Sequence, residues 1–293
     1  MKNQKYQVVI EDLLPNNQVI KLWDSIGLEV LLPSQEASYV ISGKKREISS
    51  GFSWRNGILT FHGDANLSIS TKDLEKQYHK LQSQKQSIKK QPFARALGLK
   101  NRNEGDWVLD GTMGMGKDYL LASLFGFDVV GVEKSNLCLA LVGTFLFTAK
   151  ESISSSFCFL DTTKMLEDFC INPERKNIFK VKDPRFFSTS QLQKNNGFLV
   201  GEKKISSPSV IFLDPMYDEM NETALPSKTM QILRCELEPT KIDDFNALFL
   251  VSMQAVQNRV VIKRSIKSDV KFKEYFSYSC FGKSTRYDVY LKA

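Results

Sequence analysis

Short apolar runs separated by Pro, Asn and Gly residues make up the first part of the chain. The runs "YQVVI", "LEVLL", "SYVIS" and "GILTFHG" are typical of strands joined by turns. They predict a small α+β module over residues 1–75. The next residues, 76–105, are rich in Lys, Arg and Gln, which predicts a basic helix and linker interrupted at Pro92. Within that segment "FARALGL" predicts a short helix closed by Gly98.

Strand-like and helix-like runs alternate from residue 106 to residue 293. The predicted strands are "WVLD", "FDVVGVE", "SFCFLD", "SVIFLDPMY" and "NRVVIKR", and the predicted helices are "KDYLLASLFG", "SNLCLALVGTFLFTAKE" and "DDFNALFLVSMQAV". Because these strands are apolar throughout, they favour an α/β fold with a mostly parallel sheet covered on both faces. The closing "YFSYSCFGKSTRYDVYLK" predicts an antiparallel hairpin at the sheet edge, and the polar segment 173–208 predicts an insertion.

Composition narrows the class of protein. The 293 residues are 42% hydrophobic and 25% charged, which argues against a disordered chain, and the net charge of +7 favours a polyanionic partner. The five cysteines form no C-x-x-C pair, so we expect free thiols, and two histidines are too few for a common zinc site. No apolar run reaches the roughly 20 residues of a membrane span, and the first residues do not resemble a signal peptide. We therefore expect a soluble cytoplasmic protein that binds no metal.

The stretch "DGTMGMGKD", Asp110 to Asp118, carries the first candidate site. Its glycines and lysine match the G-x-x-x-x-G-K part of a P-loop. However, Asp118 stands where a P-loop needs a Ser or Thr hydroxyl for Mg²⁺, and its charge would face a triphosphate. The loop therefore favours another ligand.

The next predicted strand indicates which ligand. It ends in Glu133, at the distance from the loop where an acid binds a ribose diol. Gly114 and Gly116 allow the backbone to approach a ligand, but the third glycine of a dinucleotide site is missing. Carboxylates at Asp110 and Asp118 would repel a pyrophosphate and suit an ammonium group, so we predict S-adenosylmethionine. Asp118 also fits a helix first turn, which is compatible with this role.

The motif "FLDPMY" at the end of a predicted strand carries the second candidate site. It resembles the [DN]-P-P-[YF] signature of methyltransferases that act on exocyclic amines. Asp214 and a backbone carbonyl, held in place by Pro215, can accept both N–H groups of an amine. Tyr217 can stack on the base. We predict that Asp214, Pro215 and Tyr217 are catalytic.

Together these motifs resemble the ribosomal RNA small-subunit methyltransferase J family, which methylates a guanine N2 of 16S rRNA. The pieces that match are "FARALGLK", "VLDGTMGMGKDYLLAS", "VVGVEKSNLCLALV", "FLDTTKML", "VIFLDPMY", "RVVIKR" and "RYDVY". The resemblance covers about two thirds of the chain, from Pro92 onward, and implies a Rossmann-like class I methyltransferase fold. The family's loop pattern is D-x-T-x-G-x-G-[RK]-D, so the likeness to a P-loop is accidental.

The resemblance also implies roles for individual residues. Lys117, Asp118, Glu133 and Lys134 would contact the cofactor, and Asp214 would be both catalytic and close to the cofactor. Thr162 and Thr163 stand where the family has a serine pair. The sequence departs from the family at Ser135-Asn136, which replaces an Asn-Pro step, and in the longer segment from 173 to 208.

An RNA substrate requires cations for its phosphates. We expect these from Lys89, Lys90 and Arg95 before the core, and from Lys263, Arg264 and Arg286 at the sheet's carboxyl edge or in the hairpin. The predicted partner is 16S rRNA or the small ribosomal subunit. Two alternatives stay open: a methyltransferase of another amine, such as adenine N6 or a protein glutamine, and a non-catalytic RNA-binding protein.

Overall fold

The computed structural model describes most of the chain in two compact units. The described residues are 6–32, 51–63, 66–70, 90–148, 156–171, 186–188, 207–215 and 241–293, with single positions between 76 and 83. The first unit comprises residues 1–77, 135–153 and 219–239, and the second comprises residues 78–134, 154–218 and 240–293.

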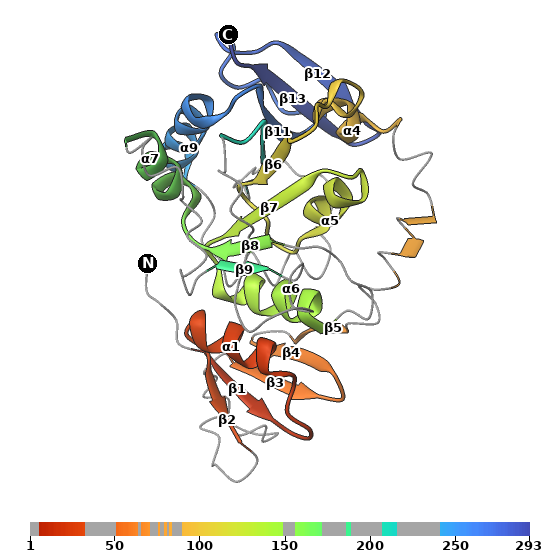
Figure 1. Ribbon diagram of the computed structural model, residues 1–293, viewed down its shortest axis with the longest axis vertical. Helices are drawn as coiled ribbons and strands as arrows, with labels where there is room; N and C mark the ends of the chain where they lie inside the picture. The colour runs from red at the N-terminus through yellow and green to blue at the C-terminus, as the bar shows by residue number, and fades with distance from the viewer. Residues whose placement is uncertain are drawn as a thin grey trace. The chain divides into compact units, whose positions relative to one another are not determined.

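The first unit is built on a five-stranded sheet of order β2-β1-β3-β4-β5 (Figure 1). Its strands are Gln7–Ile10 (β1), Glu29–Leu31 (β2), Gly51–Arg55 (β3), Ile58–His62 (β4) and Leu67–Ser70 (β5). Of the strands predicted here, "SYVIS" lies outside the described residues, and β3 and β5 are additional. Within its described residues this unit has the helices Asn17–Ser25 (α1) and Asn136–Thr148 (α6), so it combines helices and strands as an α+β unit does.

Helix α1 begins where a polar side chain satisfies its free N–H groups. The Asn16 side chain accepts hydrogen bonds from the backbone N–H groups of Gln18 and Val19. The buried face of α1 includes Trp23, whose indole N–H donates to Thr144 Oγ1 of α6 at 2.9 Å. Helix α6, which follows β7 in the chain, is therefore part of the first unit's core.

The second unit contains an eight-stranded sheet of order β12-β13-β11-β10-β6-β7-β8-β9. Its strands are Trp107–Asp110 (β6), Asp128–Glu133 (β7), Ser156–Phe159 (β8), Phe186–Ser188 (β9), Val210–Leu213 (β10), Arg259–Ser265 (β11), Tyr278–Phe281 (β12) and Thr285–Leu291 (β13). Five neighbouring strands of this sheet are parallel, namely β8, β7, β6, β10 and β11. Strands β12 and β13 form an antiparallel hairpin. The predicted α/β fold with a mostly parallel sheet and a closing hairpin is confirmed.

Two elements of this unit were not expected. Strand β9 pairs antiparallel with β8, so the segment predicted as an insertion also supplies an edge strand. Helix α7 (Thr162–Ile171) follows β8, where no helix was predicted.

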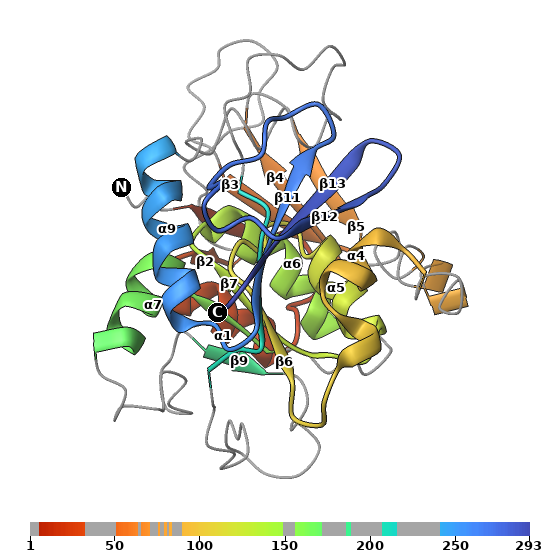
Figure 2. The same cartoon turned by 90° about the horizontal axis from the view of Figure 1, so that it is seen from above.

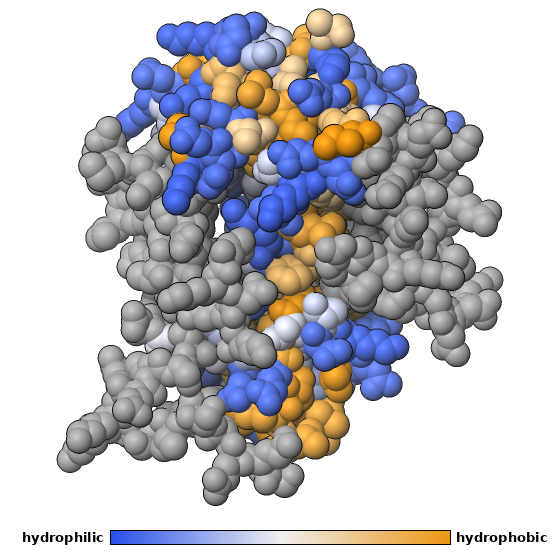
Figure 3. Space-filling view, turned by 90° about the vertical axis from the view of Figure 1, so that its left-hand side faces the viewer, coloured by the Kyte–Doolittle hydropathy of each residue, from blue (hydrophilic) through white to orange (hydrophobic). Residues whose placement is uncertain are grey.

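Helices cover both faces of the sheet, as Figure 2 shows. Helices α7 and α9 (Ile242–Ala255) lie on one side, where Leu109, Ile211 and Ile262 join Phe245 and Phe249 in a buried cluster. Helices α4 (Pro92–Ala96) and α5 (Lys117–Leu124) lie on the other side. Figure 3 shows the α7 and α9 side, where hydrophilic residues are interspersed with hydrophobic ones.

Strand order positions the candidate site. The chain runs from β6 outward through β7 and β8, then crosses back to place β10 on the other side of β6. The carboxyl ends of β6 and β10 therefore meet at the switch point of the sheet, which is where α/β folds bind ligands. Asp110 lies opposite Phe212 in this pairing, so Asp214 follows at the same edge.

Candidate functional site

Asp110 ends strand β6 with only 2% of its surface exposed. Its Oδ1 accepts a hydrogen bond from the backbone N–H of Thr112 at 3.2 Å. Burial raises the pKa of Asp110 well above its usual range, and three neighbouring carboxylates raise it further: Asp118, Asp214 and Glu133. The Thr112 hydrogen bond opposes this rise. The end of β6 is therefore electronegative, which suits a positively charged ligand group.

The glycine loop follows Asp110 and packs closely against β10. A Cβ at Gly111 would lie 2.9 Å from Leu213 Cδ2 and 3.0 Å from Thr162 Cγ2, so a side chain has no room there. Gly114 and Gly116 have φ of 51° and 71°, in the left-handed region that favours glycine. Gly116 precedes the first residue of α5, and Asp118 lies in the first turn of this helix.

Glu133 ends strand β7 and contacts the same loop. Its Oε2 accepts a hydrogen bond from the Gly114 backbone N–H at 2.7 Å. This bond fixes the carboxylate beside the loop, at the place where it was expected to accept a ribose diol. Lys117 and Lys134, each next to one of the acids, have exposed side chains.

Two threonines stabilise the loop by hydrogen bonds. Thr162, buried at the start of α7, donates its hydroxyl to the Gly111 carbonyl at 2.5 Å. Thr112 accepts a hydrogen bond on Oγ1 from the Asp214 backbone N–H at 2.6 Å. Thr162 therefore uses its hydroxyl proton on the loop backbone, and its neighbour Thr163 is half-buried. The support from Thr112 was not predicted.

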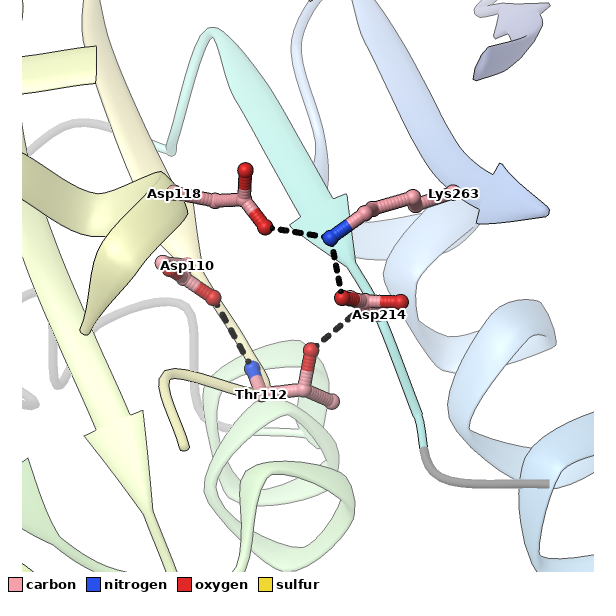
Figure 4. A network of polar contacts seen from close by, with 5 residues as sticks. All are labelled: Asp110, Thr112, Asp118, Asp214 and Lys263. Atoms are coloured by element: carbon pink, nitrogen blue, oxygen red, sulfur yellow. Dashed lines mark hydrogen bonds and ion pairs between the residues drawn. The ribbon is translucent and has the colours of Figure 1, made fainter. Parts of the chain in front are cut away.

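Lys263 joins the acid of the loop helix to the acid of the second motif (Figure 4). Its Nζ lies 2.7 Å from Asp118 Oδ2 and 2.7 Å from Asp214 Oδ2. The pairing of β10 with β11 accounts for this, because Leu213 lies opposite Ile262 and the next residues of both strands are neighbours. The Asp214 side chain remains 38% exposed, so it is accessible to a ligand.

The charges of this trio are coupled. Burial raises the pKa of Asp214, the charge and hydrogen bond of Lys263 lower it, and Asp118 raises it, with a net rise. Burial lowers the pKa of Lys263, but Asp214 and Asp118 outweigh that and raise it above its ordinary value. Lys263 is therefore a cation at neutral pH.

Tyr287 of β13 is a site neighbour that the sequence did not single out. It lies opposite Lys263 in the pairing of β11 with β13, and its ring centroid is 5.2 Å from that of Phe93. Burial raises the pKa of Tyr287, and the charges of Asp118 and Asp214 add to the rise. Its hydroxyl therefore stays protonated at neutral pH beside the acids. The matching piece "RYDVY" was a sequence signal for it.

The predicted RNA-binding residues fall into different environments. Lys90 and Arg95 are exposed, as expected of phosphate ligands. Arg286 is only 6% exposed and donates two hydrogen bonds to Asp288, Nε to Oδ1 at 2.7 Å and Nη2 to Oδ2 at 2.9 Å. Arg264 is only 7% exposed. Burial removes both arginines from the surface that a phosphate could reach, so the structure does not support these two predictions.

Some predicted residues lie outside the described part of the chain, namely Lys89 and Tyr217. Pro215 is described and buried, two residues after the end of β10. Among the described residues, no group of three or more His, Cys, Asp or Glu side chains has an arrangement that could hold a metal ion. None of the helices in the described ranges is both long and apolar enough to cross a bilayer.

Comparison with known proteins connects this site to a family. The family model of SAM-dependent methyltransferases, SAM being S-adenosylmethionine, matches residues 58–156 and 181–292, which is more than half of the chain. The chain belongs to the SAM-dependent methyltransferase family. This methyltransferase uses S-adenosylmethionine as its cofactor, as the glycine loop and strand-end acids predicted. The glycine loop is therefore neither a P-loop nor a dinucleotide-binding loop.

Individual relatives agree with the family. Ribosomal RNA small subunit methyltransferase J of Nitrosococcus oceani is 29% identical over 204 residues, which cover 69% of this chain and 68% of the relative. The enzyme of the same name from Brucella anthropi is 29% identical over 205 residues, 69% of this chain and 84% of the relative. The methyltransferase thus resembles the J family, as its motifs indicated.

A solved structure shares the fold. The SAM-dependent methyltransferase of Neisseria gonorrhoeae superposes with a TM-score of 0.59 at 19% sequence identity, covering 98% of this chain and 96% of that one. At this identity the likeness concerns the fold.

Proposed function

We propose that this methyltransferase modifies the exocyclic N2 of a guanine in 16S rRNA, in the cytoplasm, on free RNA or on the small ribosomal subunit. The observation that carries the proposal is the placement of Asp214. Its partly exposed carboxylate lies at the switch point, beside the glycine loop, and is tied to that loop through Thr112. The names of the similar J enzymes supply the RNA class.

The residues around the loop fit the cofactor. Glu133 is held beside Gly114, where it can accept a ribose diol, and the buried carboxylate of Asp110 suits an ammonium group. Asp118 lies in the first turn of α5, directly after the glycine loop. Lys117, Lys134 and Thr163 are further candidates for cofactor contacts. When bound, the cofactor supplies a methyl group on a positively charged sulfur, which needs no metal.

Asp214 would act on the acceptor. A conjugated exocyclic amine is a weak nucleophile, and a carboxylate that accepts one of its N–H groups aims the nitrogen lone pair at the methyl carbon. The amine nitrogen would form its new bond to the methyl carbon while the electron pair of the broken C–S bond stayed with sulfur. The proton that the nitrogen then loses passes to Asp214 and on to solvent. Pro215 fixes the backbone after β10, and Tyr217 would stack on a base that has left its helix.

The distribution of exposed charge supports an approach of RNA from one side. On helices α7 and α9, exposed acids outnumber exposed cations, with Glu167, Asp168, Asp243 and Asp244 against Lys164. Near α4, by contrast, Lys90, Arg95 and Lys100 are exposed. Because phosphates are drawn to cations and repelled by acids, the α4 side is the better path for the substrate.

Methyl transfer from labelled S-adenosylmethionine tests the proposal. The acceptors are 16S rRNA and small ribosomal subunits from cells that lack the protein, and the modified nucleoside is identified after digestion. We expect label in N2-methylguanosine with the wild type and with Asp128→Asn, an exposed acid at the amino end of β7. Asp214→Asn should lower kcat by about 10²-fold or more. Label in another amine would overturn the assigned target, and full activity of Asp214→Asn would overturn its role.

A further inference from the structure

Lys263 was expected to clamp an RNA phosphate, but its surroundings suit another task. Two of the three N–H donors of an ammonium are already directed at carboxylates, Asp118 Oδ2 and Asp214 Oδ2, both at 2.7 Å. The Lys263 side chain is 26% exposed and that of Asp118 only 15%. A phosphate would have to displace carboxylates that are bound at close range in a partly buried place.

The carboxylates need a cation here. Asp118 lies in the first turn of α5 and Asp214 follows the last residue of β10, and each approaches the same nitrogen. Asp110 of β6 and Glu133 of β7 lie in the same region, since the charges of Asp118, Asp214 and Glu133 all raise the pKa of Asp110. Tyr287 of β13 faces the trio as a neutral phenol. Without Lys263, like charges would separate or one carboxylate would take a proton.

We propose that Lys263 is a positioning residue for methyl transfer, which holds Asp214 against Asp118 and supplies the positive charge that lets Asp214 accept the substrate amine. The inference rests on the proposed role of Asp214. It links the two halves of the site, because Asp118 lies in the first turn of the helix after the glycine loop and Asp214 is the residue proposed to meet the acceptor. Lys263 thereby fixes the Asp214 carboxylate, which would bind the acceptor, relative to helix α5, which begins at the glycine loop.

The charge of Lys263 has a direct consequence for pH dependence. Lys263 lowers the pKa of Asp214, whereas Asp118 raises it. Removal of the lysine charge should therefore raise the pH below which Asp214 is protonated and inactive, and removal of the Asp118 charge should lower that pH. A residue that only stabilised the fold would produce neither shift.

The test measures kcat against pH at saturating cofactor and RNA for Lys263→Met, Lys263→Arg and Asp118→Asn. We expect the acidic limb of Lys263→Met to move up by about 1–3 pH units, since a nearby opposite charge shifts a carboxyl group by that amount. In Lys263→Arg, which keeps the charge, the acidic limb should move less than in Lys263→Met. In Asp118→Asn it should move to lower pH. Lys164→Met, an exposed lysine on α7, should leave the limb in place.

Two results would overturn the proposal. One is an unchanged acidic limb in Lys263→Met together with a raised KM for RNA, which is the behaviour of a phosphate clamp. The other is an unshifted limb in Asp118→Asn, which decides the matter even where Lys263→Met does not fold.

A second readout does not require turnover. In protein labelled with ¹³C at the aspartate carboxyl carbons, the Asp214 signal is assigned by its loss in Asp214→Asn. Its titration midpoint should be higher in Lys263→Met than in the wild type, and equal midpoints would overturn the inference. If the wild type transferred no methyl group to RNA, the proposed substrate would fail while this titration still tested the role of Lys263.

Discussion

The backbone N–H of Asp214 donates to the hydroxyl of Thr112 at 2.6 Å, across 102 positions of sequence. This bond joins the loop after β6 to the end of β10, and thus the cofactor side of the site to the acceptor side. Thr112 also donates its own backbone N–H to Asp110, so one residue contacts both strand-end acids. Their relative placement depends on Thr112.

The Thr112 hydroxyl can be removed with little change in shape. In Thr112→Val the Asp214 N–H loses its partner, and we expect kcat to fall about 10- to 100-fold, because small displacements of reacting groups are costly. Affinity for the cofactor should change less, since Asp110 and Glu133 keep their contacts. Thr112→Ser retains the hydroxyl and is the matched control. Equal activity of the two variants would show that the bond is dispensable.

Glu133 should act on cofactor binding rather than on chemistry. Glu133→Gln keeps an acceptor for Gly114 but loses the charge, and a hydrogen bond to a charged group is worth about 1.5–3 kcal/mol. We expect the Kd for S-adenosylmethionine, measured by calorimetry, to rise about 10- to 100-fold, with kcat retained at saturation. Glu167→Gln, exposed on α7, is the control. A lower kcat with unchanged Kd would contradict this role.

The buried charge of Asp110 should make the ligand-free protein less stable as pH rises. Its pKa is raised well above 3.8 in the folded protein, so folding favours the protonated form. The stability gained from that form is complete below the unfolded pKa and is lost as pH rises through the folded pKa.

Asp110→Asn tests this pH dependence. Relative to the wild type, the variant should gain stability toward neutral pH in denaturant unfolding without cofactor. It should also bind S-adenosylmethionine more weakly. If the difference in unfolding free energy between Asp110→Asn and the wild type did not vary with pH, burial would not be raising the pKa of Asp110.

Arg286 should contribute to stability rather than to RNA affinity. It is the partner of Asp288, whose surface is 0% exposed, and breaking a buried ion pair costs about 3–5 kcal/mol. We expect Arg286→Met to lower the free energy of unfolding by about that amount, while RNA affinity measured below its Tm stays that of the wild type. Lys267→Met removes an exposed charge of the same unit and is the control. Unchanged stability with weaker RNA binding would restore the phosphate-binding interpretation.

Hydrophobic patterning was sufficient for the central sheet because its strands are buried on both faces. It failed for α7, a helix of ten residues in which only Thr162, Met165 and Leu166 are buried. It also missed α1, although Val19, Leu22 and Trp23 follow helical spacing, because the helix has only nine residues and its start depends on the Asn16 side chain. Short helices of mixed composition acquire their stability from packing, which a single sequence does not display.

Asp110, Glu133 and Asp214 were predictable because each lies at the carboxyl end of a strand, and parallel strands bring these ends to one edge. The role of Lys263 depends on which residue of β11 lies beside Asp214, and that follows from register rather than from any local motif. The burial of Arg286 had a local signal that was missed. Arg286 and Asp288 are two apart in a predicted strand, so their side chains share a face.

Helix α6 separates β7 from β8 in the chain but completes the first unit, where Thr144 receives the indole N–H of Trp23. During synthesis, the first unit therefore cannot complete its packing until α6 has been made, which happens only after β6 and β7. The two units are completed in an interleaved order, and a fragment that stops before residue 136 would leave Trp23 without its hydrogen-bond acceptor. Because each unit is made of three separate stretches of the chain, no single cleavage releases either unit intact.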